Sequence, residues 1–547
     1  MNLLASVYNQ YRKFRYVNSF IRATKDPMGA QEKLLLKIIN KNKNTVFGKE
    51  RNFSSIKTVE DYRKNVPVMD YEEFRPYIER IKNGEQNVLT RDEVVFFSTT
   101  SGTTSEPKFC PETKRQIYLY TRNLQIFLYF AYKDHNEMFD SSILSVVSKA
   151  ARNHTKSNIP IGAISGLVYN SEPPYVKKYY SVPEEVFDIE DYEAKYYCVM
   201  RFALENEINF ILTPNPSTIL LLCHMAIKNK EWIIEDIKEG TIHEKFAIEG
   251  NIRKSLLQKL RKNPLRASFL KSLDNEGKFM PKHYWPGLKF IACWKEGTLG
   301  HYIKQLQRYF ENTAIRDLGL IASEAYCSIP ISDNANAGIL TIDTNFYEFL
   351  DTETQELHRA ETLSLNREYS LIITNCAGFY RYNLNDIVRV VDFHNKTPII
   401  KFIHRANNTT SITGEKLTEW QAVTAVNKSS EKYEIPVHHF TFYANMSKKG
   451  NYDLYLELYG PADKKKLRLF LKEVDVQLME LNMEYKDKRK SGRLGDPVLK
   501  ILEEKSYHAM HKKRSILYGQ DSQIKLPVLT DDKGFKSGIR VIEEVKV

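Results

Sequence analysis

Short apolar runs alternate with helix-like segments through the middle of the chain, and this alternation limits the possible folds most. The apolar runs have the length of buried strands and lie at residues 143–147, 210–212, 290–292 and 314–315. Apolar residues recur at helical spacing at 220–228, 252–261 and 302–310. Strands separated by helices pair in parallel, because each helix returns the chain to the same end of the sheet. The sequence therefore predicts an α/β fold.

A change of pattern divides the chain. Strand-like runs dominate residues 339–402. Two further strands and a long amphipathic helix follow at 441–443, 453–458 and 463–485. A chain of 547 residues is also too long for one ordinary core. We therefore expect two domains, at residues 1–414 and 415–547, which meet at Gly414.

Composition and charge argue against several classes of protein. Apolar residues make up 42% and charged residues 27%, as in ordinary globular proteins. The net charge of +12 would suit a nucleic-acid partner, but the basic clusters lie among acidic residues in helix-like segments. We therefore expect solvated helix faces and no nucleic acid. The six cysteines are scattered, and the thirteen histidines form no ligand pattern, which predicts reduced thiols and no zinc site.

No segment of the chain has the length and hydropathy of a membrane span. The most apolar stretch, 218–227, is much shorter than the roughly 20 residues that cross a bilayer. Basic residues at 12–15 interrupt the N-terminal apolar residues too early for a signal peptide. We expect a cytoplasmic protein without a membrane span, either a monomer or a homodimer.

A loop rich in hydroxyl groups follows the strand-like run 94–97. Residues 99–108 read Thr-Thr-Ser-Gly-Thr-Thr-Ser-Glu-Pro-Lys. Glycine permits a tight turn, hydroxyl and backbone N–H groups donate to phosphate oxygens, and lysine adds a mobile charge. Such a loop taken alone is more often an ordinary turn, and it is not the Walker P-loop. The candidates for phosphate binding are Thr100, Ser101, Gly102, Thr103, Thr104 and Lys108.

Two later segments carry acidic residues that suit a nucleotide. Residues 320–324 read Leu-Ile-Ala-Ser-Glu, although Ser-Glu without further context indicates a helix cap. Residues 374–386 read Thr-Asn-Cys-Ala-Gly-Phe-Tyr-Arg-Tyr-Asn-Leu-Asn-Asp. A carboxylate such as Asp386 can accept hydrogen bonds from both ribose hydroxyls. Glu324 and Asp386 are therefore the acidic candidates.

These segments resemble, in order, the signatures of the adenylate-forming superfamily. The string Ala-Gly-Phe-Tyr-Arg-Tyr is similar to that of one branch, the auxin-responsive Gretchen Hagen family of acyl-acid amido synthetases. Further blocks continue the likeness along nearly the whole chain, among them Gly-Glu-Lys at 414–416 and Gln-Ile-Lys-Leu-Pro at 523–527. Ser105 and Asn385 stand where that family usually has glycine. The chain is identified as a member of the family, of bacterial type.

The resemblance implies a role for each matching residue. The loop residues and Lys108 would hold the β- and γ-phosphates of ATP, and Glu324 would bind Mg²⁺. The remaining nucleotide contacts would come from Ala322 and Ser323 along adenine and from Asp386 and Arg405 at the ribose. Lys416 would reach the α-phosphate, and Lys525 would arrive on the C-terminal domain. Candidate walls of the acyl pocket are Asn123, Phe127, Tyr326 and Gly297, although core packing explains the aromatic ones equally well.

The resemblance also implies a fold and a reaction. The N-terminal adenylation domain would contain mixed β-sheets flanked by helices and a β-barrel-like part, and the small α/β C-terminal domain would move. The enzyme would convert a small carboxylic acid and ATP into acyl-AMP and pyrophosphate, and then pass the acyl group to an amine, an amino acid in particular. Two alternatives stay open: a ligase that forms acyl-CoA or another thioester, and a non-catalytic relative that keeps the fold.

Overall fold

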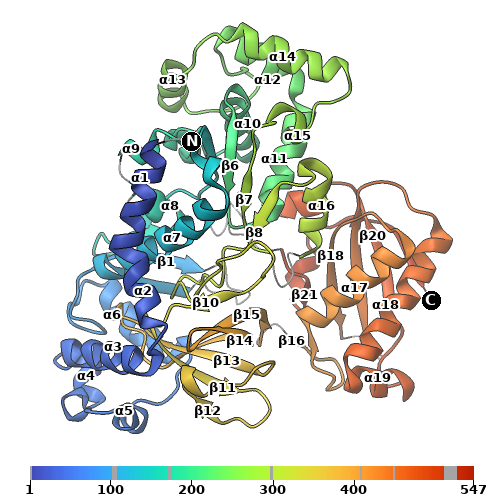
Figure 1. The fold of residues 1–547 in the computed structure, drawn as a ribbon. Helices are drawn as coiled ribbons and strands as arrows, with labels where there is room; N and C mark the ends of the chain where they lie inside the picture. The colour runs from blue at the N-terminus through green and yellow to red at the C-terminus, as the bar shows by residue number, and fades with distance from the viewer. Residues whose placement is uncertain are drawn as a thin grey trace.

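The structure, a computed structural model, shows three regions (Figure 1). A helix-rich part around α14 (Pro264–Asn275) lies at the top, a strand-rich part lies below it, and a C-terminal unit lies at the right. The N-terminal helices run down the left side of the first two regions. The structure describes residues 3–100, 108–170, 172, 174–295, 300–406, 409–446, 450–510 and 526–546.

A parallel sheet of four strands lies beneath the helix-rich part. In the order β3-β6-β7-β8 its strands are Ser142–Ser145, Ile208–Leu212, Phe290–Ala292 and Ala314–Arg316. The helices predicted beside it are α11 (Pro216–Lys228), α13 (Gly250–Lys259) and α16 (Gly300–Phe310). Because the strands pair in parallel and helices connect them, the prediction of an α/β fold is confirmed.

An antiparallel sheet of seven strands forms the strand-rich part, in the order β12-β11-β13-β14-β15-β10-β9. Its strands are Leu357–His358, Phe346–Asp351, Glu368–Thr374, Tyr382–His394, Thr397–Arg405, Gly338–Leu340 and Ser328–Ile329. The strand order is open, so among the described residues the pairing of this sheet does not close into a barrel. A smaller sheet beside it, β2-β1-β5-β4, consists of Lys108–Thr113, Val94–Thr100, Pro160–Gly162 and Ala151–His154.

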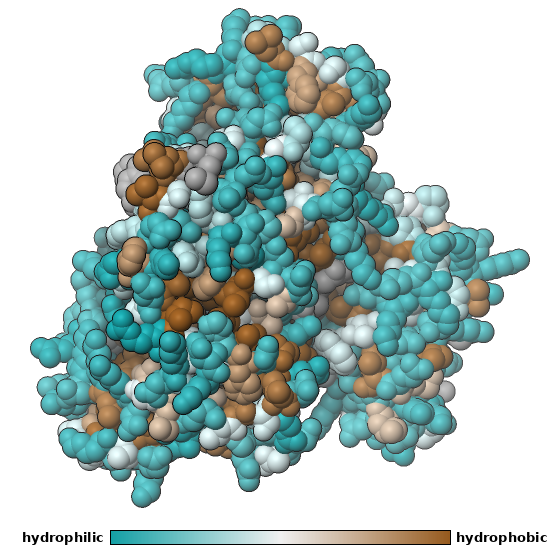
Figure 2. Space-filling view, in the orientation of Figure 1, coloured by the Kyte–Doolittle hydropathy of each residue, from teal (hydrophilic) through white to brown (hydrophobic). Residues whose placement is uncertain are grey.

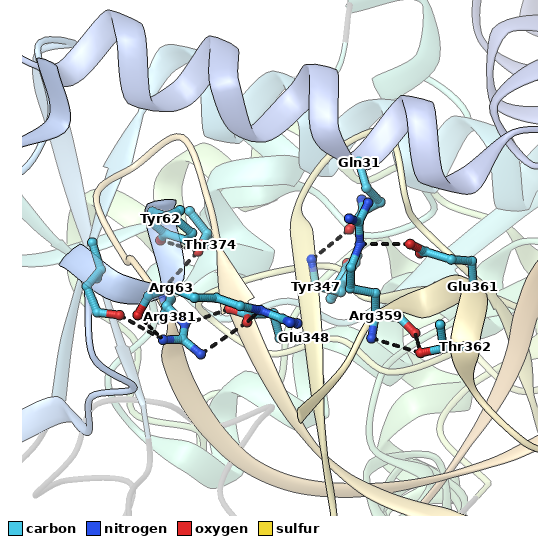
Figure 3. Close-up of polar contacts among 11 residues, drawn as sticks. Gln31, Tyr62, Arg63, Tyr347, Glu348, Arg359, Glu361, Thr362, Thr374 and Arg381 are labelled. Carbon is cyan, nitrogen blue, oxygen red and sulfur yellow. Dashed lines mark hydrogen bonds and ion pairs between the residues drawn. The ribbon is translucent and has the colours of Figure 1, made fainter. Parts of the chain in front are cut away.

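Helix α3 (Pro27–Asn42) is fixed to the antiparallel sheet by one buried side chain, Gln31 (Figure 3). Its amide oxygen accepts the N–H of Tyr347 at 2.7 Å, and its amide nitrogen donates to the carbonyl of Asn345 at 2.7 Å. A glutamine can do this because its side chain carries both an acceptor and a donor. The contact sets the position of α3 along β11.

Arg381 joins the N-terminal helices to the same sheet. Its guanidinium donates to Glu348 on β11 at 2.7 Å (Nε–Oε2) and 3.1 Å (Nη2–Oε1), and to the carbonyl of Val66 at 2.7 Å. Arg63, on α5 (Val59–Asn65), donates to the same carboxylate at 2.8 Å (Figure 3). Since Arg381 and Glu348 are buried, a charge network shielded from water ties the helices to the sheet.

The C-terminal unit contains a sheet of five strands in the order β21-β18-β19-β20-β22. The strands are Leu529–Thr530, Val437–Asn445, Asn451–Leu458, Val498–Leu502 and Val541–Lys546, and α17 (Glu419–Tyr433) and α18 (Lys464–Leu481) contribute to the core. The helix predicted at 463–485 is two helices. Asn482 interrupts it, because its side chain accepts the N–H of Tyr485 at 2.8 Å and caps α19 (Met483–Lys490).

A short hairpin precedes α17. Its strands are β16 (Thr409–Thr410) and β17 (Leu417–Thr418). The buried carboxylate of Glu415 holds the turn by accepting the N–H groups of Ile412 at 2.7 Å and Thr413 at 2.8 Å. The same carboxylate accepts the hydroxyl of Tyr452, on β19, at 2.5 Å. The predicted boundary at Gly414 therefore falls inside a hairpin that is hydrogen-bonded to the C-terminal unit.

The C-terminal unit packs against α16 (Figure 1). The hydroxyl of Tyr302, on α16, lies 2.9 Å from Nδ1 of His439, on β18. The hydroxyl of Tyr459 donates to the side-chain oxygen of Gln305 at 2.6 Å. These polar contacts define one orientation of the unit relative to the parallel sheet.

Candidate functional site

The predicted phosphate loop connects two paired strands. β1 ends at Thr100 and β2 begins at Lys108, and these two residues are partners in the antiparallel register. The pairing thus brings both ends of the loop together and holds the backbone of Lys108 in the sheet. Ser101, Gly102, Thr103 and Thr104 lie outside the described residues.

Glu324 lies at the tip of a tight turn. A β-bridge joins Ile321 to Tyr326, and the N–H of Ala322 donates to the carbonyl of Ala325 at 2.9 Å. No helix starts here, so the helix-cap interpretation of Ser323-Glu324 is wrong. The turn carries Glu324 into the buried interior of the region, where its side chain is almost inaccessible to water.

Three segments that are distant in sequence hold Glu324. Its carbonyl accepts from the amide of Gln116, on α7 (Lys114–Asp134), at 3.2 Å and from that of Asn375 at 2.8 Å. Its carboxylate oxygen Oε1 accepts the hydroxyl of Tyr382, on β14, at 3.2 Å. Burial, and to a smaller extent Glu324, raises the pKa of Tyr382 well above its usual value, so the tyrosine stays a donor. In the described part of the chain nothing bonds to the second carboxylate oxygen, so it can take another partner.

Asn375 organises the turn before β14. Its side-chain oxygen accepts three successive backbone N–H groups, those of Ala377 at 3.0 Å, Gly378 at 3.0 Å and Phe379 at 3.1 Å. Gly378 has φ +117°, and a Cβ there would come within 2.6 Å of the Cβ of Leu89. Only glycine fits this position without strain. The Asn-Cys-Ala-Gly part of the sequence signature therefore shapes the turn that also holds Glu324.

Asp386 and Arg405 face each other across β14 and β15. They are register partners, and Nε of Arg405 lies 3.4 Å from Oδ1 of Asp386. Asp386 is buried. The Arg405 side chain is 39% exposed, so its guanidinium can reach a ligand bound at the surface of the sheet. The nearby Asp386 carboxylate raises the pKa of Arg405, which keeps the guanidinium charged. The two residues form an acid–base pair with an open side.

Asn385, which replaces the glycine usual in the resembling family, has φ +59°. Asparagine adopts the left-handed region more readily than other residues with a side chain, because its short amide can bond to nearby backbone. Here the Asn385 N–H is held by the side-chain oxygen of Asn383 at 2.9 Å. The replacement therefore keeps the backbone course that places Asp386. Ser105, the other replacement, lies outside the described residues.

The acyl-pocket candidates form part of one buried cluster. The amide of Asn123 lies 3.4 Å from the carbonyl of Tyr326 and 3.4 Å from the hydroxyl of Thr344. Phe127 is fully buried in the same hydrophobic cluster as Tyr326, whose hydroxyl donates to the carbonyl of Leu318 at 3.0 Å. Their polar groups are satisfied within the protein, as in core packing. Gly297 lies outside the described residues.

Of the two lysine candidates, the structure describes Lys416. Lys416 is exposed and has φ +44°, directly after the buried Glu415. In the described part of the chain it makes no ion pair or hydrogen bond with Glu324, Asp386 or Arg405. Lys525 lies outside the described residues.

Sequence analysis missed Glu112, a second buried carboxyl in this region. On β2, its Oε1 accepts the hydroxyl of Ser98, on β1, at 2.7 Å, and its Oε2 has no partner among the described residues. Burial, and next the charge of Glu324, raises the pKa of Glu112 well above its usual value. An acidic residue two places before a helix is usually interpreted as a solvated charge, so only the buried hairpin reveals Glu112.

Replacing Glu112 with glutamine should stabilise the protein increasingly as the pH rises. A raised pKa in the folded state means that folding is most favourable below the usual glutamate pKa and weakens as the pH rises towards the raised one. Glutamine keeps the acceptor for Ser98 and cannot ionise. The difference in unfolding free energy between Glu112→Gln and wild type should therefore grow by about 1.4 kcal/mol per pH unit within this window. Urea unfolding at a series of pH values measures it.

The matched control for that experiment is Glu484→Gln on the exposed surface of α19. Its unfolding free energy should follow wild type at every pH. Parallel curves for wild type and Glu112→Gln would contradict a neutral Glu112 in the folded protein.

Models of one family match the chain in three consecutive parts. They are the GH3 family N-terminal domain at residues 16–315, the central domain at 338–405 and the C-terminal domain at 420–534. The chain belongs to the GH3 family. The family identified from the sequence signatures is thereby confirmed, and the hairpin at 409–418 lies between the central and C-terminal matches.

Curated members of the GH3 family resemble the chain over most of its length. Jasmonoyl–L-amino acid synthetase JAR6 of Nicotiana attenuata is 24% identical and aligns with 96% of this chain and 95% of its own. Indole-3-acetic acid-amido synthetase GH3.10 of Arabidopsis thaliana is 25% identical over 85% of both chains. The structure of the GH3.15 acyl acid amido synthetase matches with a TM-score of 0.86 at 20% identity, over 96% of this chain and 95% of that one. The predicted architecture is confirmed, whereas the bacterial type stays a prediction.

Proposed function

We propose that this GH3 family chain is an ATP-dependent acyl-acid amido synthetase, which adenylates a small carboxylic acid and transfers the acyl group to an amino acid. Its relatives along nearly the full length are amido synthetases, and this agrees with the carbon–nitrogen ligase expected from the sequence. The observation that carries the proposal is the clamped Glu324, whose charge adds to that of Asp386 in raising the pKa of Arg405.

In the first half-reaction, a carboxylate oxygen of the acid attacks the α-phosphorus of ATP. The bond from that phosphorus to the bridging oxygen breaks, and pyrophosphate leaves with the electron pair. A carboxylate resists attack by an amine at neutral pH, and the mixed anhydride with AMP removes this obstacle. The loop residues Thr100 to Thr104 with Lys108 would bind the β- and γ-phosphates, and Asp386 and Arg405 would bind the ribose, with Ala322 and Ser323 along adenine.

The oxygen donors present fit Mg²⁺ better than a softer metal. No group of three or more His, Cys, Asp or Glu side chains in the described part of the chain could hold a metal by itself. Mg²⁺ commonly takes one or two protein carboxylates and completes its shell with water and substrate phosphates. Glu324 would provide that carboxylate, since Tyr382 engages only Oε1. When bound, the ion would neutralise charge on the polyphosphate.

In the second half-reaction, a neutral amine attacks the acyl carbon and AMP leaves. The amide forms when the nitrogen loses its proton, so the site needs an unprotonated amine and exclusion of water. Asn123, Phe127, Tyr326 and Gly297 are the proposed acyl-side residues. Lys416 and Lys525 would stabilise charge at the α-phosphate from different orientations of the C-terminal domain.

The boundary of the moving domain is best placed before the hairpin at 409–418. Rotation of the C-terminal domain about Gly414 would break the pairing of β16 with β17 and the hydrogen bonds of the Glu415 carboxylate. Because Glu415 is bonded to Tyr452 in the C-terminal unit, the hairpin would travel with that unit. We therefore propose that the N-terminal domain ends after β15, a few residues earlier than the boundary at 414.

Exchange of labelled pyrophosphate into ATP across a panel of carboxylic acids tests the first half-reaction. Product analysis with amino acids or coenzyme A then tests the second. An amide is expected. A thioester would favour the acyl-CoA ligase alternative, and no exchange with any acid would favour a non-catalytic relative.

Replacing Asp386 with asparagine should raise the KM for ATP by about 10–100-fold, because a buried charged acceptor of ribose hydroxyls contributes roughly 1.5–3 kcal/mol. The measurement is pyrophosphate exchange as a function of ATP concentration. Asp392→Asn is the control, since Asp392 lies exposed on the same strand. An unchanged KM for the Asp386 variant would make the residue a partner of Arg405 only.

A further inference from the structure

The first helix of the chain buries polar side chains and exposes apolar ones, which is the reverse of an ordinary surface helix. Asn9 and Arg12, on α1 (Leu3–Arg12), are only 6% and 4% exposed. Nε of Arg12 donates to the side-chain oxygen of Gln125, on α7, at 2.8 Å, and the guanidinium lies 4.5 Å from the ring centre of Tyr8. Helices of globular proteins normally bury their apolar stripe and expose polar residues. Here polar side chains fix the helix to the protein.

The outward face of this helix is apolar. Leu3, Leu4, Val7 and Phe14 are 61–72% exposed and Tyr11 is 47% exposed. Their spacing follows α1 into the single wide turn η1 (Lys13–Val17), so they form one stripe. Figure 2 shows brown side chains at the outer end of α1, at the upper left of the molecule. Single exposed apolar residues are common, but an aligned stripe marks a contact surface.

The charged residues of the N-terminal segment itself are all basic. No aspartate or glutamate occurs among residues 1–25, which contain five basic residues. Lys13 and Arg15, both exposed, are turned to either side of Phe14, and Arg22 and Lys25 are exposed further along. Apolar side chains flanked by lysine and arginine are typical of helices that lie in a lipid interface.

We propose that the stripe Leu3, Leu4, Val7, Tyr11 and Phe14 docks on an anionic lipid surface. The apolar side chains would enter the headgroup region, while Lys13 and Arg15 would meet lipid phosphates. A second copy of the chain fits less well, since two such helices would bring like charges together with no acid in residues 1–25 to pair with them. In the described part of the chain no helix could cross a membrane, so the contact is peripheral.

The stripe on α1 lies outside the part of the chain that matches the family. The match to the GH3 family N-terminal domain begins at residue 16, beyond the last residue of the stripe. The helix is also held in place by Arg12 before any lipid arrives, so binding needs no folding of this segment. Lipid binding by α1 can therefore be tested separately from the amide-forming activity.

Flotation of the full-length protein with vesicles tests the docking. Vesicles of equal parts phosphatidylglycerol and phosphatidylcholine should carry the protein upward, vesicles of phosphatidylcholine alone should not, and added salt should release it. The double variant Val7→Glu/Phe14→Glu should lower the bound fraction about tenfold or more, because both changes place charge within the apolar stripe. Lys13→Gln/Arg15→Gln should reduce binding while leaving the stripe apolar.

The matched control is Leu265→Glu, which changes a leucine 84% exposed on α14, away from the stripe, and should float like wild type. Circular dichroism and pyrophosphate exchange should be the same for all variants, which excludes misfolding. The proposal is overturned if wild type does not float with anionic vesicles or if the stripe variants float equally well. A wild-type dimer that Val7→Glu/Phe14→Glu dissociates, without vesicle binding, would assign the stripe to self-association.

Discussion

Arg381→Met should lower the free energy of unfolding by about 3–5 kcal/mol, because it leaves the buried Glu348 carboxylate without its main partner. The lost contacts are the two hydrogen bonds to Glu348 and the bonds to the carbonyls of Val66 and Arg63, which together fasten the N-terminal helices to β11. Methionine fills a similar volume, so the effect reports charge pairing more than a cavity. Urea unfolding at neutral pH measures it.

Two controls separate the network from simple packing. Arg63→Met removes the other arginine on Glu348, but its side chain is 26% exposed, so its loss should cost clearly less. Combining Arg381→Met with Glu348→Leu should recover much of the stability, since an apolar pair of similar size can replace a buried ion pair. If the double variant is as unstable as Arg381→Met alone, the cost comes from packing and from the lost bond to Val66.

The central strands of the parallel sheet, β6 and β7, could be predicted because they are almost wholly buried. A strand that is covered on both faces is mostly apolar, so β7 and residues 210–212 of β6 appear in the sequence as continuous apolar runs. Helix α16 could also be predicted, because the face that packs on the core gives apolar residues at helical spacing. The break between α18 and α19 was missed, because Asn482 within an amphipathic pattern only acts as a cap once its side chain meets the N–H of Tyr485.

The signature Phe-Tyr-Arg-Tyr illustrates how a motif can be recognised while its physical role is not. From the sequence it indicates a nucleotide site, and Tyr382 does contact Glu324. Arg381 and Tyr380, however, point into the protein: Arg381 binds Glu348 and Tyr380 donates to the carbonyl of Leu89 at 2.7 Å. Those partners lie far away in sequence, so no local pattern reveals them.

Residues of the candidate site were predictable where the chemistry is local and not where it depends on packing. Glu324 and Asp386 stand in short strings whose order identifies them. Glu112 and Gln116 do not, since their importance comes from the fold: β2 and α7 bring one beside Ser98 and the other against the Glu324 carbonyl. The spacing of residues along the sequence does not reveal such long-range contacts.

The second large effect is expected at Glu324. Glu324→Gln should reduce pyrophosphate exchange by about 10²–10³-fold, because an uncharged amide cannot balance Mg²⁺ on the polyphosphate as a carboxylate does. Glutamine keeps Oε1 as an acceptor for the Tyr382 hydroxyl. The amides of Gln116 and Asn375 donate to the backbone carbonyl of residue 324, so the substitution does not remove these bonds. The unfolding free energy should therefore stay close to that of wild type while exchange is lost.

The matched comparison is Glu112→Gln, which makes the same change at the other buried carboxyl of the region. Because burial already disfavours the charged form of Glu112, its variant should keep exchange activity. Titration with Mg²⁺ separates the two further: excess ion should partly restore Glu324→Gln if the carboxylate serves to hold the ion. Equal losses in both variants would mean that the two carboxyls act as one unit, and full activity in Glu324→Gln would remove Glu324 from the proposed metal site.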